Sequence, residues 1–119
     1  MNSTNEKLIR LLLAKTKNKL IVWSRSSMIN EYKTELKSAT IHVSYGESVA
    51  IGAINLEYFS VSMYNGTGAP ISLAHEETGD SGFDLLSQLY DAAKDSCTRE
   101  SETISNLLEE LHSLGLVEG

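Results

Sequence analysis

The amino-acid sequence predicts an α+β fold: an antiparallel meander of about five strands with an N-terminal helix and one or two C-terminal helices. Two observations lead to this prediction. Apolar residues recur at helical spacing at both ends of the chain, whereas the middle contains segments of alternating polarity. The connections between these segments are short, and parallel strands need a crossover of about a dozen residues. With 119 residues, we expect a single domain over 1–119.

The first helix is predicted from a capping signal and an apolar face. Ser3 and Glu6 have the spacing of a capping box, in which both side chains bond to backbone N–H groups at a helix start. Downstream, one face of the helix carries Leu8, Ile9, Leu12 and Leu13. We expect this face to pack against the sheet.

The strands are predicted in chain order. The β-branched and aromatic stretch 20–24 is expected to be the first strand, followed by a hairpin that joins 32–36 to 41–45 across a short turn. The glycine-bearing segment 46–55 is left open as a loop or the start of the next strand. Over 54–64, Phe59, Val61 and Met63 lie on the opposite parity from Ile54, Leu56 and Tyr58, which predicts a bulge near Tyr58.

The stretch "YNGTGAP" over 64–70 is predicted to be a hairpin turn. A phosphate-binding loop needs a further glycine or a Gly-Lys-Ser/Thr at fixed spacing, and it leads into a helix. Here a strand over 70–75 follows, and Pro70 suits the start of an edge strand. The two glycines supply the positive φ that a tight turn requires.

The C-terminal third is predicted to be helical. Ser81 has capping spacing to Asp84, and an apolar stripe begins directly after it. The stripe comprises Phe83, Leu86, Tyr90, Ala93 and Cys97, and it continues through Ile104, Leu107, Leu108 and Leu111. The polar stretch 98–102 lacks Gly and Pro, so either one long helix or two helices fit. Gly115 is expected to end the last one.

Charge is distributed unevenly along the chain. The net charge is −6, with +5 over residues 1–45 and −9 over 76–119. The two ends could attract each other within the fold or across a dimer, and the acidic end could instead bind a basic partner. The basic cluster at 15–19 stands alone and the pI is near 5.0, so nucleic acid is not an expected partner.

The composition gives expectations on compartment. The longest apolar runs have four residues, far short of the roughly 20 needed to span a bilayer, so no membrane association is expected. Charges at Glu6, Lys7 and Arg10 break up the apolar run that an export signal requires. The single cysteine, Cys97, favours a reducing, cytoplasmic location.

Chemically reactive side chains are few and scattered. His75, Glu76 and Glu77 are consecutive on an expected strand, so their side chains alternate between faces and cannot converge on a metal. His42 is expected at the surface, and no Gly-x-Ser-x-Gly motif is present. We therefore assign no catalytic residue, metal or cofactor, and leave open whether the chain is an enzyme.

The segments "YNGTGAPIS", "FDLLSQLYDAAKDS" and "ISNLLEELHSLG", in this order after an alternating strand, carry a resemblance. The chain resembles a class of small uncharacterised bacterial and phage proteins with an N-terminal helix, a meander and a helical tail. The first hairpin departs from that pattern because it has "LKSA" where an Asn-Gly-like turn is typical. The resemblance implies a fold and no activity.

Two functions from different classes remain as hypotheses. One is a non-enzymatic binding or adaptor protein, dimeric or bound to a protein partner through a sheet face or the acidic C-terminal helices. The other is a small-ligand binder or enzyme with a pocket between sheet and helices. Most strand aromatics are expected in the core. The candidate binding surface comprises Trp23, Tyr32, Tyr64, Glu102, Glu109 and Glu110.

Overall fold

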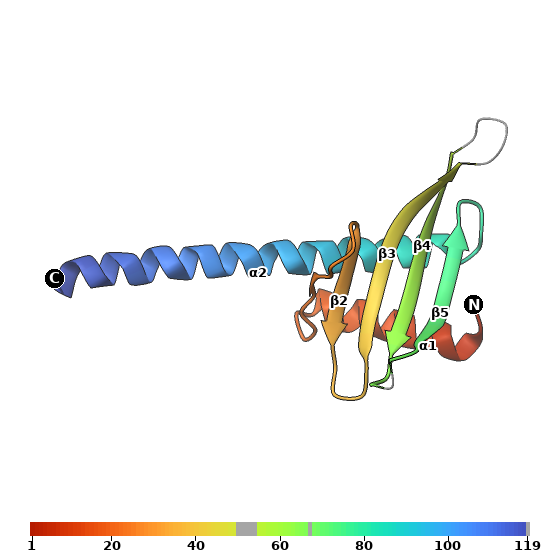
Figure 1. The fold of residues 1–119 in the computed structure, drawn as a ribbon, viewed down its shortest axis with the longest axis horizontal. Helices are drawn as coiled ribbons and strands as arrows, with labels where there is room; N and C mark the ends of the chain where they lie inside the picture. Colours follow the sequence, from red (N-terminus) through yellow and green to blue (C-terminus); the bar gives the residue numbers. More distant parts are fainter. Residues whose placement is uncertain (50–54, 67, 119) are drawn as a thin grey trace.

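A computed structural model describes residues 1–49, 55–66 and 68–118. It confirms the predicted α+β arrangement of an N-terminal helix, an antiparallel sheet and a C-terminal helix (Figure 1). The elements in chain order are α1 (Ser3–Lys17), β1 (Ser24–Arg25), β2 (Glu31–Glu35), β3 (Thr40–Val49), β4 (Asn55–Tyr64), β5 (Pro70–Glu77) and α2 (Phe83–Glu118).

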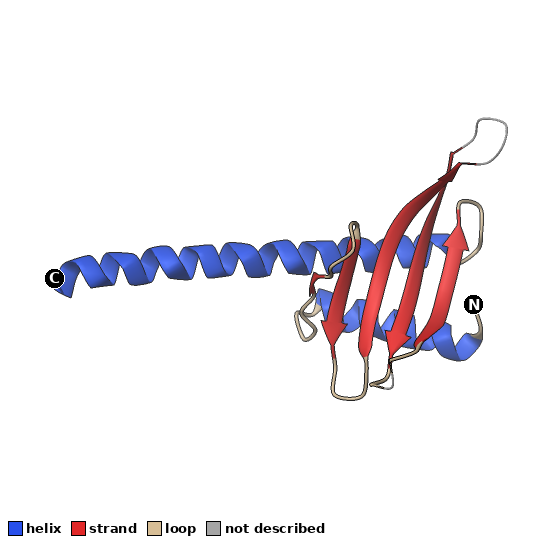
Figure 2. Ribbon diagram, viewed as in Figure 1, coloured by secondary structure: helices blue, strands red, loops and turns tan. Residues whose placement is uncertain are grey.

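The strands form one meander. Their order in the sheet is β1-β2-β3-β4-β5, and every neighbouring pair is antiparallel (Figure 2). The predicted hairpin is confirmed, because β2 and β3 pair with Tyr32 opposite Val43 and Thr34 opposite Ile41. β3 extends to Val49, so the first part of the undecided segment 46–55 is strand.

Both helices cover the same face of the sheet (Figure 1). The apolar side chains of β2 to β5 point to this face and meet the apolar stripes of α1 and α2. The fully buried side chains at the centre are Ile9, Trp23, Val43, Val61, Leu86 and Leu89. The opposite face of the sheet, which we call the outer face, carries polar and aromatic side chains.

The start of α1 differs from the prediction. Asn2 is the N-cap, and its side-chain oxygen accepts a hydrogen bond from the backbone N–H of Asn5 at 2.8 Å. Ser3 is already the first helical residue, and Glu6 pairs with Arg10 one turn on. The predicted apolar face is confirmed, since Ile9, Leu12 and Leu13 are buried.

The predicted first strand over 20–24 is wrong, because strand pairing is limited to Ser24 and Arg25. Side-chain bonds hold the preceding segment instead. The backbone N–H of Trp23 donates to Ser96 Oγ at 3.1 Å, and Thr34 Oγ1 donates to the carbonyl of Val22 at 2.9 Å. These bonds occupy the backbone groups that a strand would use in a ladder.

The bulge lies elsewhere than predicted. Pairing of β4 with β3 is regular from Asn55 to Tyr64, and Tyr58 faces outward. The register shifts instead between Val61 and Ser62 on the β5 side, which leaves Leu73 of β5 as the extra residue. The carbonyl of Leu73 accepts a bond from the side chain of Asn5 at 2.9 Å. The prediction for Ile54 lies outside the described residues.

The "YNGTGAP" stretch is the turn between β4 and β5, as predicted. Tyr64 pairs with Pro70, and β5 is an edge strand. Gly66 has φ +84° and Gly68 has φ +90°, a conformation that residues with a side chain rarely adopt. The glycines therefore serve the turn geometry.

The C-terminal region is one helix, α2, which settles the alternative between one helix and two. The expected stop at Gly115 is wrong, since α2 continues to Glu118. A glycine in an exposed helix costs only about 1 kcal/mol relative to alanine, too little to end a helix by itself. None of the described helices is apolar enough over a sufficient length to cross a membrane.

The second half of α2 projects beyond the sheet and α1 (Figure 1). We call residues 98–118 the arm and residues 1–97 the body. The arm makes the molecule long, with a longest extent of 64 Å and a radius of gyration of 17.6 Å. A compact chain of this length would have a radius of roughly 13 to 14 Å.

Candidate functional site

The arm displays large apolar side chains to solvent. Each is between 51 and 62% exposed, although these are residue types that folded proteins usually bury. They are Ile104, Leu107, Leu108, Leu111 and Leu114, and we call them the arm stripe. An amphipathic helix in water owes most of its stability to packing of its apolar face. An uncovered face of this kind is a candidate interaction surface.

The arm stripe continues the face of α2 that packs in the core. Ile104, Leu107, Leu111 and Leu114 follow spacings of three, four and three, which is the a and d pattern of a heptad repeat. Extended backward in the same frame, that pattern passes Glu100 at a d position and then reaches Leu86, Tyr90, Ala93 and Cys97. Leu86 and Ala93 are fully buried, and the other two pack against the core. One face of one helix is therefore covered in the body and open in the arm.

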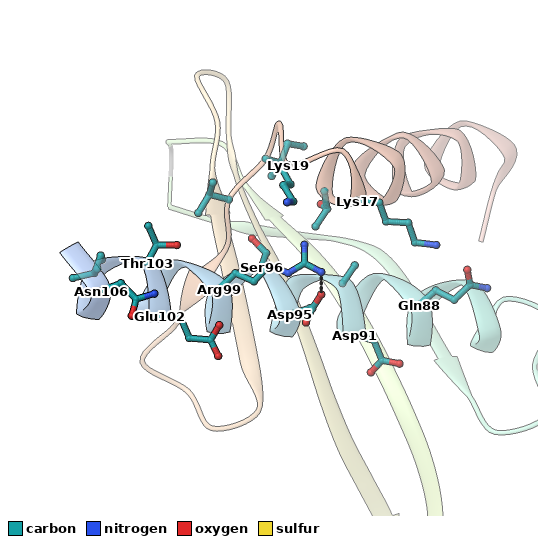
Figure 3. A pocket seen from close by; sticks show the side chains of 15 residues that line it. Lys17, Lys19, Gln88, Asp91, Asp95, Ser96, Arg99, Glu102, Thr103 and Asn106 are labelled. Carbon is teal, nitrogen blue, oxygen red and sulfur yellow. Dashed lines mark hydrogen bonds and ion pairs between the residues drawn. The ribbon is translucent and has the colours of Figure 1, made fainter. Parts of the chain in front are cut away.

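A groove of about 980 Å³ lies where the arm leaves the body. One wall is a face of α2 from Gln88 to Asn106, and the other is the end of α1 with the loop after it (Figure 3). Lys17, Lys19 and Val22 come from the second wall. Arg99 points from α2 toward the loop that carries Lys19, and its guanidinium pairs with Asp95. The groove thus combines charged and apolar groups.

Further apolar side chains lie in the segment between α1 and β2, at the end of the body from which the arm projects (Figure 1). They are Leu20, Val22, Met28 and Ile29, each more than half exposed. Surface apolar residues are common singly, but this group lies beside the base of the arm, whose stripe is also uncovered. The end of the body and the arm together form a larger apolar surface.

The predicted surface residues fall into three places. Trp23 and Tyr32 are buried in the core, so they contribute no exposed area. Tyr64 lies at the end of β4 on the outer face, where its ring is 4.7 Å from that of His42. Glu102, Glu109 and Glu110 lie on the arm and are exposed.

Three of the arm's five glutamates lie off the arm stripe. At 100° per residue, Glu102 and Glu109 point away from the centre of the arm stripe, and Glu110 lies at its flank. A partner that packs on the stripe would leave two of these three carboxylates in water. The other two glutamates, Glu100 and Glu118, occupy the d and a positions that bound the stripe at its two ends.

The outer face of the sheet carries cross-strand pairs. Ser60 Oγ and His75 Nδ1 are 2.7 Å apart, and His75 Nε2 is 3.6 Å from Glu77. A serine beside a histidine is a possible nucleophile pair. These side chains lie on an open face, and β4 is paired on both sides, so its backbone N–H groups serve the ladders rather than a developing oxyanion. We therefore interpret these cross-strand pairs as structural contacts on the sheet surface and not as a nucleophile pair.

Histidine placement agrees with the alternation of the strands. His75 points outward with Glu77, whereas Glu76 between them is buried on the helix side. Within the described ranges, no group of three His, Cys, Asp or Glu side chains is placed to hold a metal ion. His42 lies on the outer face, 3.1 Å from Glu31.

Two tyrosines have raised pKa values. The Tyr45 hydroxyl donates to the Glu47 carboxylate at 2.9 Å, and this bond, with smaller effects of burial and of the Glu47 and Glu57 charges, raises the pKa of Tyr45 to about 12. Desolvation in the core, followed by the influence of Tyr32, raises the pKa of Tyr90. Both stay protonated at neutral pH and therefore do not act as bases there.

In comparisons with protein-family models, curated proteins and solved structures, no match to the chain was found. Function must therefore be argued from the geometry alone.

The sequence pattern contains most residues of the arm stripe but does not determine their exposure. The apolar stripe of 104–111 was expected to continue the stripe of 83–97, but the pattern cannot tell whether the sheet extends far enough to cover it. Among the described side chains of α2, Cys97 is the last that packs against the core. Beyond it, the arm exposes leucines as well as glutamates. Leu114 completes the heptad and was not included in the predicted stripe.

Proposed function

We propose that this chain is a non-enzymatic protein-binding module that uses the arm stripe to hold the apolar face of a helix from a protein partner. The observation that carries this proposal is the half-exposed state of five large apolar side chains on a helix that projects from the body. Covering them removes apolar surface from water, which is the main favourable contribution to association.

A helical partner suits the stripe better than a strand or a membrane. Its heptad spacing is the pattern by which helices interlock side chains with other helices. Helices that lie on membranes carry lysine and arginine on their polar face. The arm instead has five glutamates and one arginine over 98–118, which anionic lipid would repel.

The carboxylates give the module a preference among partners. Glu110 lies at the flank of the stripe, so a basic group that flanks a partner's apolar face is favoured there. A reducing, cytoplasmic compartment suits the free thiol of Cys97.

The test uses two matched double variants of the full chain, tagged and expressed in its host. L107S/L111S removes the centre of the stripe, and E102S/E109S changes the opposite side of the same helix. We expect the parent and E102S/E109S to retain bound protein, including untagged copies of the chain, and L107S/L111S to lose it. Equal retention by all three proteins, or none by the parent, would refute the proposal.

The groove supports a second candidate function, the binding of a small ligand. Its volume of about 980 Å³ is at the upper end of the range for ligand sites, and Lys17, Lys19 and Arg99 could hold an anionic group. It lies beside the two helices rather than between sheet and helices, where fully buried side chains such as Trp23 and Leu89 fill the space. A metabolite screen by thermal shift tests it, since a ligand at 100 times its Kd stabilises by about 2.7 kcal/mol. A screen without any shift would argue against it.

A further inference from the structure

We propose that the partner of the arm stripe is a second copy of this chain, and that the two arms pair antiparallel with the two bodies at opposite ends. This proposal rests on the proposed function and specifies its partner. Three observations support it: the heptad spacing in the arm, the side of α2 on which the body lies, and the distribution of charge.

The heptad spacing allows two arms to pair without a gap. In an antiparallel coiled coil, an a position of one helix packs against a d position of the other. Ile104 and Leu111 occupy a positions, and Leu107 and Leu114 occupy d positions. Pairing Ile104 with Leu114 of the second copy also brings Leu107 opposite Leu111, and the two-fold axis repeats both contacts. All four layers are apolar, and the layer beyond them at each end places Glu100 of one copy opposite Glu118 of the other.

The position of the body determines the direction. The arm stripe and the core contacts of Leu86 and Ala93 lie on the same face of α2, so the body occupies the stripe side of the helix. Paired helices lie 8 to 10 Å apart. In a parallel pair, both bodies would fall at the same level in the space between the two helices and would collide. In an antiparallel pair, each body lies beyond the tip of the other arm.

Basic side chains lie where the tip of the second arm would arrive. Residues 109–118 contain three glutamates and His112, with no lysine or arginine. In the antiparallel pair this segment runs toward the other copy's Lys17 and Lys19, at the end of its α1, and toward Arg99. The exposed side chains of Leu20 and Val22 at that end offer apolar contact to the arriving tip. The end of the body therefore offers basic and apolar side chains to the tip, beside the carboxylates of Asp91, Asp95 and Glu102 that line the same groove.

The experiment places single cysteines in the purified full-length chain, with Cys97→Ser as background. Ile104→Cys and Leu114→Cys are made separately on copies that differ in mass through a tag, and a short thiol-to-thiol cross-linker is added. In the antiparallel pair, position 104 lies opposite 114, whereas two copies of position 104 are ten residues apart along the helix axis, about 15 Å. We expect a cross-linked heterodimer in the mixture and no cross-link in either protein alone. The added change Leu107→Ser should remove the heterodimer.

Each other outcome overturns the inference in a recognisable way. Cross-linked homodimers of each protein alone would show parallel arms. No cross-link in any sample would show that the purified chain does not pair through its arms. In that case, host-protein capture that depends on Leu107 and Leu111 would leave the proposed function standing with a different partner. If neither the cross-link nor the capture that depends on Leu107 and Leu111 is observed, both proposals are rejected.

Discussion

At the scale of single residues, the segment between α1 and β1 is held by a chain of buried hydrogen bonds. The indole N–H of Trp23 donates to Thr16 Oγ1 at 2.8 Å, and that hydroxyl donates in turn to the carbonyl of Leu12 at 2.7 Å. Both side chains are almost fully buried. A buried indole without an acceptor would lose its hydrogen bond to water and gain none in the protein.

Thr16→Val is therefore expected to lower the free energy of unfolding by about 1 to 3 kcal/mol, the usual cost of an unsatisfied buried donor. Thr98→Val is a matched control, because Thr98 makes the same bond to the carbonyl four residues back but is exposed. Its effect should stay within about 0.5 kcal/mol. Urea denaturation measures both, and equal effects would mean that the indole bond does not contribute.

The Tyr45 hydroxyl bond gives a prediction on pH. The unfolded phenol titrates near pH 10, whereas the folded one has a pKa of about 12. Above pH 10 the unfolded chain loses this proton first, so Tyr45's contribution to stability is complete below pH 10 and is lost as pH rises toward 12. Glu47→Gln should lower the pKa of Tyr45 toward 10, as followed by NMR of the ring carbons. Glu35→Gln, distant along the sheet, should leave it unchanged, and an unaltered Tyr45 titration in the Glu47 variant would contradict this assignment.

At the scale of elements, α2 has two environments along one face. Leu86 and Leu107 share the same d position in the heptad frame, yet the first is fully buried and the second is half exposed. The first half of the helix closes the core, and the second half leaves the same kind of surface exposed, which is the surface proposed to bind a partner. A pair of identical substitutions can separate these two roles.

Leu86→Ala is expected to lower the free energy of unfolding by about 2 to 5 kcal/mol, because it leaves a cavity in the core. Leu107→Ala should change it by less than about 0.5 kcal/mol in dilute protein, where copies are separate. At high concentration Leu107→Ala should weaken self-association. Thermal and urea unfolding at two protein concentrations measure these effects, and a large loss of stability for Leu107→Ala in dilute protein would mean that the arm folds back on the body.

The sequence alone predicts most of these elements. Strand alternation predicts the β2–β3 hairpin, and the two glycines predict the turn at 64–70. Helical spacing predicts the apolar faces of α1 and α2. Boundaries were less accurate where side chains compete with backbone pairing. Asn2 rather than Ser3 caps α1, and bonds from Ser96 and Thr34 replace the ladder expected over 20–24.

A local sequence pattern cannot predict that the arm is exposed, because exposure depends on how far the sheet extends along the helix. The apolar periodicity of α2 is the same before and after Cys97, while the burial differs. The sequence therefore identified the residues of the candidate site as an apolar stripe and left open whether this stripe docks on the sheet or stands free. Its acidic residues were recognised as a surface feature, and Glu102, Glu109 and Glu110 are exposed.

At the scale of the whole molecule, the body lies at one end and the arm at the other, which gives a lone copy an apolar surface and an elongated shape. Antiparallel pairing would cover both arms and leave the bodies apart. Such an interface is isologous, with the same surface used on both copies, which is the commonest symmetry of protein dimers.

Small-angle X-ray scattering of the purified full-length chain over a concentration series tests this account most directly. A single copy has a longest extent of 64 Å, of which the arm's 21 residues supply about 30 Å. An antiparallel pair, with overlapping arms and one body at each end, should scatter with twice the monomer mass and a longest dimension of roughly 100 Å. A monomer mass at all concentrations, or a dimer mass with a longest dimension that stays near 64 Å, would contradict it.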